Sequence, residues 1–407
     1  MGINKNTKQA LFEDGKKRAG YAWVVLAVIF IASVAAPVNQ FKVPPVMPAL
    51  ISEFGLNMTM AGLLMSMFSF AGLCMAFPAG LVLSRLGQKK TCITALILII
   101  SGSLVGAFSA TTSQILCSRV LEGAGMVMLG VTAPVVISGW FPPERRGLPM
   151  GIWSAWVSTG IVLIMNTSPH VSPPGQWVQT WWLATGYAFL ALVFFILLYR
   201  NPAQAKEADM ERQPLIKDLF MEALAKRDVW LISIALFTFN ITVLAMNTFF
   251  PTYLAKVHGL SMERADFFSS IPNIAMLLSC PLGGWIADKT GYRKPIFSIC
   301  LGLLALWWLA AFRTPVWALP VLMAVFGLIG GPIISTIVTA LPDAVKRPAL
   351  IGFGMSLLMF WHHLGEFVGP LYFGALLDKT SSWTIAAIFM VPICVIGGVA
   401  GAMMKVR

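Results

Sequence analysis

The sequence predicts an all-helical polytopic membrane protein, with twelve transmembrane helices in two six-helix bundles related by pseudo-two-fold symmetry. Three observations predict this fold class: the composition, a series of long apolar runs and an internal repeat. Hydrophobic residues make up 57% of the 407 residues and charged residues 11%, whereas a soluble domain carries about 25% charged residues. So little charge could not cover the surface of a soluble fold.

Apolar runs long enough to cross a bilayer recur along the whole chain. A helix needs about 20 apolar residues to span the hydrocarbon core. The first run begins at Gly20, after a polar and basic stretch; it is too long for a signal-peptide core and has no small-residue cleavage site. The predicted spans are 20–48, 58–82, 91–110, 114–139, 148–167, 178–199, 229–252, 266–287, 294–312, 316–340, 350–374 and 382–404.

Lysine and arginine positions predict which side of the membrane each loop faces. With the N-terminus in the cytoplasm, 23 of these residues fall on the cytoplasmic side. Only Lys256, Arg264, Arg313 and Lys379 fall on the opposite side. This asymmetry predicts that both termini are cytoplasmic. The basic residues form short clusters without interleaved aromatic residues, so we expect no nucleic-acid partner despite the net charge of +12.

One long polar loop divides the chain into two halves. Its Leu215–Trp230 stretch is mildly amphipathic, which is typical either of a helix on the membrane surface or of a solvated linker. The predicted organisation is a cytoplasmic tail (1–19), an N-terminal six-helix bundle (20–200), a cytoplasmic linker (201–228), a C-terminal six-helix bundle (229–404) and a short cytoplasmic tail (405–407).

The two halves repeat a loop motif at an offset of 204 residues, from Gly80 to Gly284. A second echo pairs Arg146 with Arg347 at an offset of 201 residues. Two echoes at nearly one offset indicate a duplicated six-helix unit with its substrate site between the copies.

The repeated motif is interpreted as a conformational latch. Its glycines permit a tight turn and close helix contact, and its cations can pair with helix C-termini or with acids on neighbouring helices. The alternative is that the charges only determine topology. The latch residues are Gly80, Arg85, Gly87, Lys89, Gly284, Asp288, Gly291 and Arg293.

Together these motifs resemble those of the major facilitator superfamily, over residues 20–404. Arg119-Val-Leu-Glu-Gly123-Ala-Gly125 is similar to the family's fourth-helix motif, and Trp140 to Gly147 is similar to the loop that follows it. Ser84 stands where the family has an acid, which Asp288 retains in the second copy. The resemblance implies alternating access around a central cavity, with a weaker latch in the first half.

A finer resemblance is to monocarboxylate transporters. Asp14-Gly15 followed by Gly20-Tyr21-Ala22-Trp23 is similar to a stretched form of their entry signature, and Lys42 lies where that family has a lysine that matters for transport. The acid–arginine pair of that family's eighth helix is missing from Phe267–Ile286. The fourth-helix arginine is equally similar to that of organic-anion symporters in the same superfamily.

Ionisable residues inside the predicted spans are few, and such residues usually line a cavity or pair with one another. Arg119 and Glu122 share one helix face. They form either a self-neutralising structural pair or a substrate-binding arginine with a proton site beside it. Lys42 follows Asn39 and Gln40 near the outer end of the first span. It either snorkels to the outer surface or binds a carboxylate.

Span eleven carries His362, His363 and Glu366, spaced so that the carboxylate reaches either histidine. Histidine titrates near neutral pH, which favours proton coupling; the alternative is an interhelical hydrogen-bond cluster. One His/Glu pair offers too few ligands for a metal site, so none is predicted. The candidate substrate-binding residues are Arg119, Lys42, Asn240, Trp156 and Asn273, and the candidate proton-coupling residues are His362, His363, Glu366 and Glu122.

These observations predict a secondary active transporter of a small organic anion, such as a monocarboxylate, working by proton coupling or anion exchange. The alternatives are a proton-driven multidrug or metabolite efflux antiporter, and a membrane sensor or scaffold. We predict no enzyme activity, because no Walker loop, Gly-x-Ser-x-Gly elbow or HExxH motif occurs. No cofactor is expected. The expected partners are a small-molecule substrate and the lipid bilayer, and the expected state is a monomer in a prokaryotic inner membrane.

Overall fold

The computed structural model describes residues 5–75, 78–142, 145–173, 175–201, 226–345 and 348–404, and every regular element within these ranges is a helix. Eleven helical stretches of this described part are long and apolar enough to cross a membrane. The all-helical, multi-span prediction is therefore confirmed. The elements are α1 (Lys5–Gln40), η1 (Pro44–Val46), α2 (Met47–Phe54), α3 (Met58–Met75), α4 (Pro78–Ala107), α5 (Thr112–Trp140), α6 (Gly147–Ser154), α7 (Trp156–Val171), α8 (Val178–Leu198), α10 (Arg227–His258), α11 (Met262–Thr290), α12 (Arg293–Ala311), η3 (Val316–Ala318), α13 (Leu319–Val345), α14 (Pro348–Thr380), α15 (Trp383–Ile388) and α16 (Met390–Ala402).

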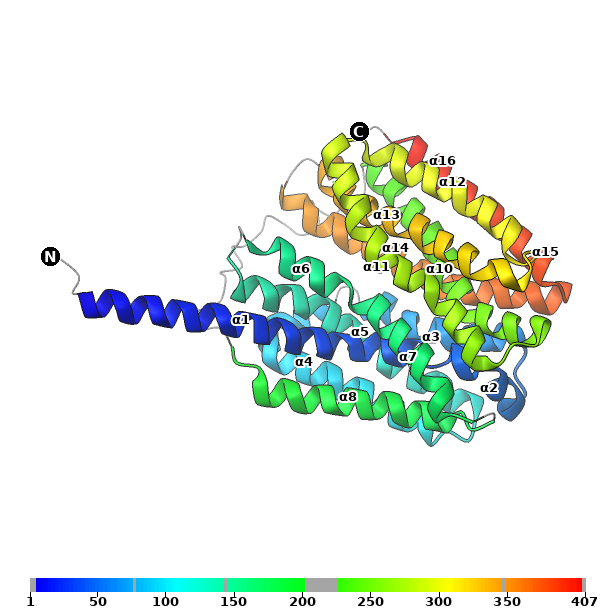
Figure 1. Ribbon diagram of the computed structural model, residues 1–407, viewed down its shortest axis with the longest axis horizontal. Coiled ribbons are helices and arrows are strands. Elements are labelled where there is room, and N and C mark those ends of the chain that lie inside the picture. The colour runs from blue at the N-terminus through cyan, green and yellow to red at the C-terminus, as the bar shows by residue number, and fades with distance from the viewer. Residues whose placement is uncertain are drawn as a thin grey trace.

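The helices pack in two groups that follow the order of the chain (Figure 1). The first group contains α1 and α3 to α8, and the second contains α10 to α16. The groups meet where α3 packs along α14 and where α7 packs along α11. We call the end of the molecule that carries α2 and α15 the distal end, and the end at which α1 projects the proximal end (Figure 1).

The first predicted span, 20–48, is broken rather than continuous. Helix α1 ends at Gln40, and the chain resumes as η1 at Pro44 and as α2 at Met47. Pro44 and Pro45 cause the break, because proline lacks an N–H and disfavours helical geometry in the residue before it. At its other end α1 begins at Lys5, so the predicted tail is helical from that residue on.

Two further predicted spans are interrupted. Span 148–167 divides into α6 and α7 at Ala155, and span 382–404 divides into α15 and α16 at Phe389. Most of the predicted linker 201–228, with much of the Leu215–Trp230 stretch, lies outside the described residues, as do the extreme termini 1–4 and 405–407.

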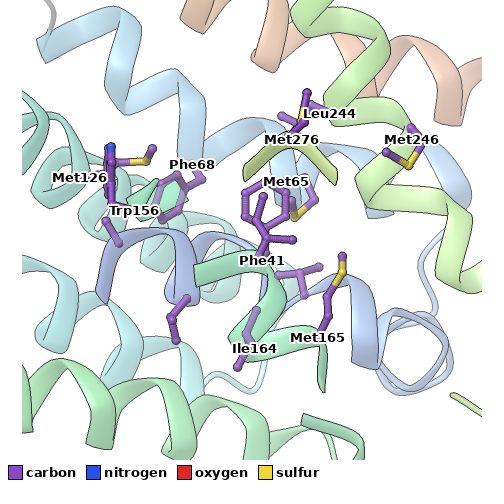
Figure 2. Packing of buried hydrophobic residues seen from close by; sticks show 14 of the residues in the cluster. Phe41, Met65, Phe68, Met126, Trp156, Ile164, Met165, Leu244, Met246 and Met276 are labelled. Carbon is purple, nitrogen blue, oxygen red and sulfur yellow. The ribbon is translucent and has the colours of Figure 1, made fainter. Parts of the chain in front are cut away.

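Methionines and aromatic residues fill the space where the two groups of helices meet. Figure 2 shows Phe41, at the break of α1, beside Met65 of α3, with Leu244 of α10 and Met276 of α11 nearby. All four side chains are buried. Methionine fills irregular space and repacks easily because its side chain is unbranched and polarisable. The contact between the groups is therefore apolar and adaptable at this level.

Candidate functional site

The first group of helices encloses a fully buried charged triad of Lys42, Arg119 and Glu122. The Lys42 Nζ lies 2.6 Å from one Glu122 carboxylate oxygen, and Arg119 donates to the other. All three side chains have no exposed surface. With the three groups ionised, two cations face one anion, and the site carries one net positive charge.

Every proton of the Lys42 ammonium has an acceptor. Besides Glu122, Lys42 donates to Ser103 Oγ at 2.7 Å and to Asn39 Oδ1 at 3.0 Å. Its Nζ also lies 4.6 Å from the ring centre of Trp181, a cation–π distance. Of the two alternatives for Lys42, snorkelling to the outer surface does not occur, because α1 breaks just before this residue and turns its side chain into the helix group.

Arg119 stabilises the broken end of α1. Its guanidinium donates to the carbonyl oxygens of Asn39 and Gln40, both at 2.7 Å, and to Leu64 O at 3.3 Å. The last carbonyls of a helix lack partners within the helix, and a cation there also complements the helix dipole. Arg119 therefore joins α1, α3 and α5 around the break.

A second charged cluster lies where α14 meets α3. His363 Nδ1 is 3.3 Å from one oxygen of Glu366, and His362 Nε2 is 3.5 Å from the other. Ser69 of α3 donates to Glu366 at 3.1 Å, so this cluster spans the two groups of helices. Its side chains are 12–28% exposed, unlike the triad.

The same three residues place potential metal-ligand atoms within 4.8 Å of one another. The two His–Glu separations, 3.5 and 3.3 Å, are ion-pair distances, and neighbouring ligands on one tetrahedral zinc ion are spaced similarly, so the spacing alone does not separate the two arrangements. In this structure the side chains contact one another. The sequence-based pairing of Glu366 with either histidine matches this geometry.

The other candidate substrate-binding residues do not join the triad. Asn240 donates to Leu236 O within its own helix α10, at 2.8 Å. Asn273 of α11 donates to Asn247 of α10 at 2.9 Å. Trp156 stacks on Trp153 with ring centres 5.6 Å apart. All three candidates are buried, but on three different helices.

Two of the four glycines of the latch motif form turns. Gly87 has φ of 74° and Gly291 has φ of 70°, so both copies adopt the left-handed conformation that glycine allows. A Cβ at Gly80 would meet nothing within 4 Å, and one at Gly284 only the Ser335 Cβ at 3.8 Å. Arg85 is exposed and Lys89 half-buried, whereas the side chains of Asp288 and Arg293 lie outside the described part.

Sequence reasoning misses two acids. Asp378, near the end of α14, accepts from the N–H groups of Met58 and Thr59 at 2.9 and 2.8 Å and so caps the start of α3. Asp266 of α11 is fully buried, and neither of its oxygens has a hydrogen-bond partner in the described part of the chain. The available signal for Asp266 was its helical spacing from Ser270 and Asn273.

Comparison with known proteins agrees with this architecture. A family model described as Major Facilitator Superfamily matches residues 29–292 and 265–407. The chain is 23% identical to the hexuronate transporter of Bacillus subtilis (strain 168), over 88% of this chain and 89% of the relative. It is 21% identical to the D-galactonate transporter of Escherichia coli O6:H1, over 72% of this chain and 73% of the relative.

Solved structures show the same fold. The chain superposes with a TM-score of 0.77 on a bacterial homolog of the human lysosomal transporter Spinster, in an inward-facing and unoccupied conformation, at 16% identity over 94% of this chain and 96% of that one. The nucleoside transporter NupG gives a TM-score of 0.75 at 15% identity, over 94% and 100%. These relatives are transporters rather than enzymes, and this chain is an integral, multi-pass membrane protein that belongs to the major facilitator superfamily.

Proposed function

We propose that this protein is a secondary transporter that moves a small organic anion across the membrane by alternating access. The observation that carries the proposal is the buried triad, in which Lys42 and Arg119 outnumber Glu122. An uncompensated positive charge inside a membrane protein is costly and usually functional. An anion that enters the protein would neutralise it.

The named relatives support this substrate class. The hexuronate and D-galactonate transporters are named for carboxylated sugars, and a probable sulfoacetate transporter of Cupriavidus necator is 20% identical over 67% of this chain. A carboxylate or sulfonate is the common feature of these compounds. A monocarboxylate remains our narrower proposal.

Proton coupling has a direct physical route through the triad. Glu122 occupies both cations in this structure. Protonation of Glu122 would release Lys42 and Arg119 for a substrate carboxylate, so that one proton and one anion bind together. The cluster of His362, His363 and Glu366 is a second proton-coupling candidate, because its contact with Ser69 joins the two groups of helices. Exchange of two anions uses the same cations without the proton.

The moving parts proposed are the bundles 20–200 and 229–404, joined by the linker 201–228. The charge asymmetry of the loops supports a cytoplasmic proximal end and cytoplasmic termini. The proposed location is a prokaryotic inner membrane. Asp378 of α14 accepts from Met58 and Thr59 of α3 at the distal end, and in the proposed cycle this contact holds that end closed. The latch motif would exchange contacts at the proximal end as the bundles move. We propose that the protein works as a monomer, because all residues of the proposed site belong to one chain.

Uptake into proteoliposomes tests the proposal. D-glucuronate, D-galactonate, sulfoacetate and lactate are offered with and without a pH gradient, to the wild type, to Arg119→Gln and to Arg313→Gln. Arg313 is an exposed arginine and serves as the matched control. We expect at least one anion to accumulate, the pH gradient to raise its uptake, and only Arg119→Gln to abolish it. Uptake that survives Arg119→Gln would contradict the assignment of the site.

Efflux of lipophilic cations is the second candidate, because two observations favour it. The methyl viologen resistance protein of Salmonella typhimurium is 22% identical over 89% of this chain, and methionines such as Met65 and Met276 line the contact between the helix groups. Coulomb repulsion from Lys42 and Arg119 disfavours a cationic substrate. Proton-driven transport of methyl viologen, with no response to the anions, would establish efflux instead.

A further inference from the structure

Asp266 is a buried acid that the triad and the histidine cluster do not use. Its side chain has no exposed surface, and both carboxylate oxygens lack a hydrogen-bond partner among the described residues. By contrast, Glu122 accepts from Lys42 and Arg119, and Glu366 accepts from Ser69. Asp266 is therefore chemically distinct from these two buried acids.

The position of Asp266 places it at the contact between the two helix groups. Ser270, one turn further along α11, accepts from Asn166 of α7 at 3.1 Å. Asn273, two turns along, donates to Asn247 of α10 at 2.9 Å. Residues spaced by four and by three lie on one helix face. Asp266 thus begins a polar stripe on the face of α11 that turns toward α7 and α10.

A surface pocket at the distal end lies within one helical turn of Asp266. Residues of α7 and α11 line it, and Glu263, Arg264 and Phe267 flank Asp266 in sequence. Asn166, which binds Ser270, also lines the pocket. Separation of α7 from α11 would join this pocket to the carboxyl group. The complete lining is Asn166, Pro169, His170, Glu263, Arg264 and Phe267.

The charged groups of the surrounding elements do not neutralise Asp266 in this state. Helix α10 carries Lys256 and His258 at its distal end, and His258 pairs with Tyr253 at 3.0 Å. The half of α13 nearest the distal end, residues 319–331, contains no titratable side chain. The remaining titratable groups at this end of α7 and α11 are His170, Glu263 and Arg264.

An ionised carboxylate in this position would have lost its water without gaining a donor. Such a buried, unpaired ion carries a large desolvation penalty, whereas the neutral acid costs far less. Closure of α7 against α11 is therefore compatible with a protonated Asp266 and opposed by an ionised one. The proton comes from water in the distal pocket and returns there when the contact opens.

We propose that Asp266 is a proton-binding site that controls closure of the distal end: the α7–α11 contact closes when the carboxyl group is protonated and opens when it is ionised. The inference rests on the alternating-access function proposed above. It adds a titratable gate in the second group of helices, separate from the anion site in the first.

Pulsed electron paramagnetic resonance tests the gate without a substrate. Spin labels are placed at Phe108→Cys and Trp317→Cys, which are 74% and 83% exposed on the distal side of the two groups. The exposed Cys74 and Cys117 are first replaced by serine. The distance between the labels is measured in lipid nanodiscs from acid to alkaline pH, for the wild type, Asp266→Asn and the neighbouring control Glu263→Gln.

We expect the wild type and Glu263→Gln to move to a longer distance as the pH rises, and Asp266→Asn to keep the short distance throughout. Asp266→Ala, which is also uncharged, carries the same expectation if the asparagine variant fails to fold. A wild type insensitive to pH, or an Asp266→Asn variant that titrates like the wild type, overturns the proposal. If Glu263→Gln loses the pH response as well, the response belongs to the pocket as a whole rather than to Asp266, and the proposal is also overturned. Failure of anion uptake alone, with this titration intact, would reject the proposed function and keep the gate.

Discussion

The triad in the first group of helices and the histidine cluster at the α3–α14 contact both hold ionisable side chains inside the protein, but they differ in burial and in where their partners lie. Lys42, Arg119 and Glu122 are fully buried, and all lie within one group. His362, His363 and Glu366 remain partly exposed, and their partner Ser69 belongs to the other group. Contacts within a group hold a shape, whereas contacts between groups can break as the groups move. We therefore expect changes in the triad to affect mainly the unfolding temperature, and changes in the histidine cluster to affect mainly the balance between open and closed arrangements of the two groups.

The largest effect is expected from Glu122→Gln. This change leaves Lys42 and Arg119 buried without a counter-ion, and breaking a buried ion pair in this way costs about 3–5 kcal/mol. Unfolding of the purified protein should therefore occur at a markedly lower temperature. Glu53→Gln removes an exposed acid from α2 and serves as the control. Equal unfolding temperatures for the two variants would show that the triad adds no net stability.

A double-mutant cycle sharpens this result. Adding Lys42→Met to Glu122→Gln removes one of the two unpaired cations, so part of the lost stability should return. The coupling between the two sites is the difference between the double and the summed single effects. Strict additivity would mean that the 2.6 Å contact contributes nothing to the folded state.

A smaller loss is expected from Gly102→Ala, which disturbs the triad by steric contact alone. A Cβ at Gly102 would lie 2.7 Å from Glu122 Cγ and 2.8 Å from Ser118 O. Overpacking of this kind costs about 1–3 kcal/mol, and the unfolding temperature measures it. Gly130→Ala on α5 is the matched control, because a Cβ there meets nothing within 4 Å. An equal response of both variants would point to helix propensity instead.

Asp378→Ala tests a contact between the groups. The variant loses the acceptor for the first N–H groups of α3, and loss of a helix cap costs about 1 kcal/mol. We expect the distal spin labels at positions 108 and 317 to shift toward the longer distance, with little change in unfolding temperature. Thr59→Val removes only the hydroxyl contact of 2.5 Å and should shift the distance less. A lower unfolding temperature without a change in label distance would show that Asp378 stabilises the fold but does not hold the distal end closed.

The smallest effect is expected from Ser69→Ala. It removes one hydrogen bond to Glu366 across the α3–α14 contact, worth about 1 kcal/mol or less. The distal distance distribution should broaden slightly toward the open form. Ser154→Ala, at an exposed serine whose bond stays within α6, provides the comparison. A response larger than that of Asp378→Ala would reverse the proposed order of the two contacts.

Local patterns predict the parts of the site that lie on one helix. Arg119 pairs with Glu122, and Glu366 approaches His362 and His363, because residues three or four apart share a helix face. Lys42 is 80 residues from Glu122, and their contact depends on how α1 packs against α5. No periodicity in the sequence encodes that packing.

The sequence also contains signals that span prediction alone overlooks. The pair Pro44 and Pro45, preceded by the polar residues Asn39, Gln40 and Lys42, marks the break in the first span. Asp266 begins a predicted span, where an acid is ordinarily taken to be exposed; the packing of neighbouring helices around α11 buries it. The multi-span helical fold follows from composition and run length, whereas the partners of each buried charge follow from the arrangement of helices.

The pairing of Lys42 with a residue 80 positions later has a consequence for biogenesis. The first span leaves the ribosome before Glu122 has been synthesised, so its lysine and the open carbonyls of Asn39 and Gln40 enter the membrane unpartnered. Lys42 lies just beyond the last residue of α1, near the end of the span, so its ammonium can extend to the nearby interface until Glu122 arrives. Packing of α5 against α1 therefore moves this lysine from an interfacial to a fully buried position, and chains stalled before residue 122 should keep Lys42 accessible to water-soluble labelling reagents.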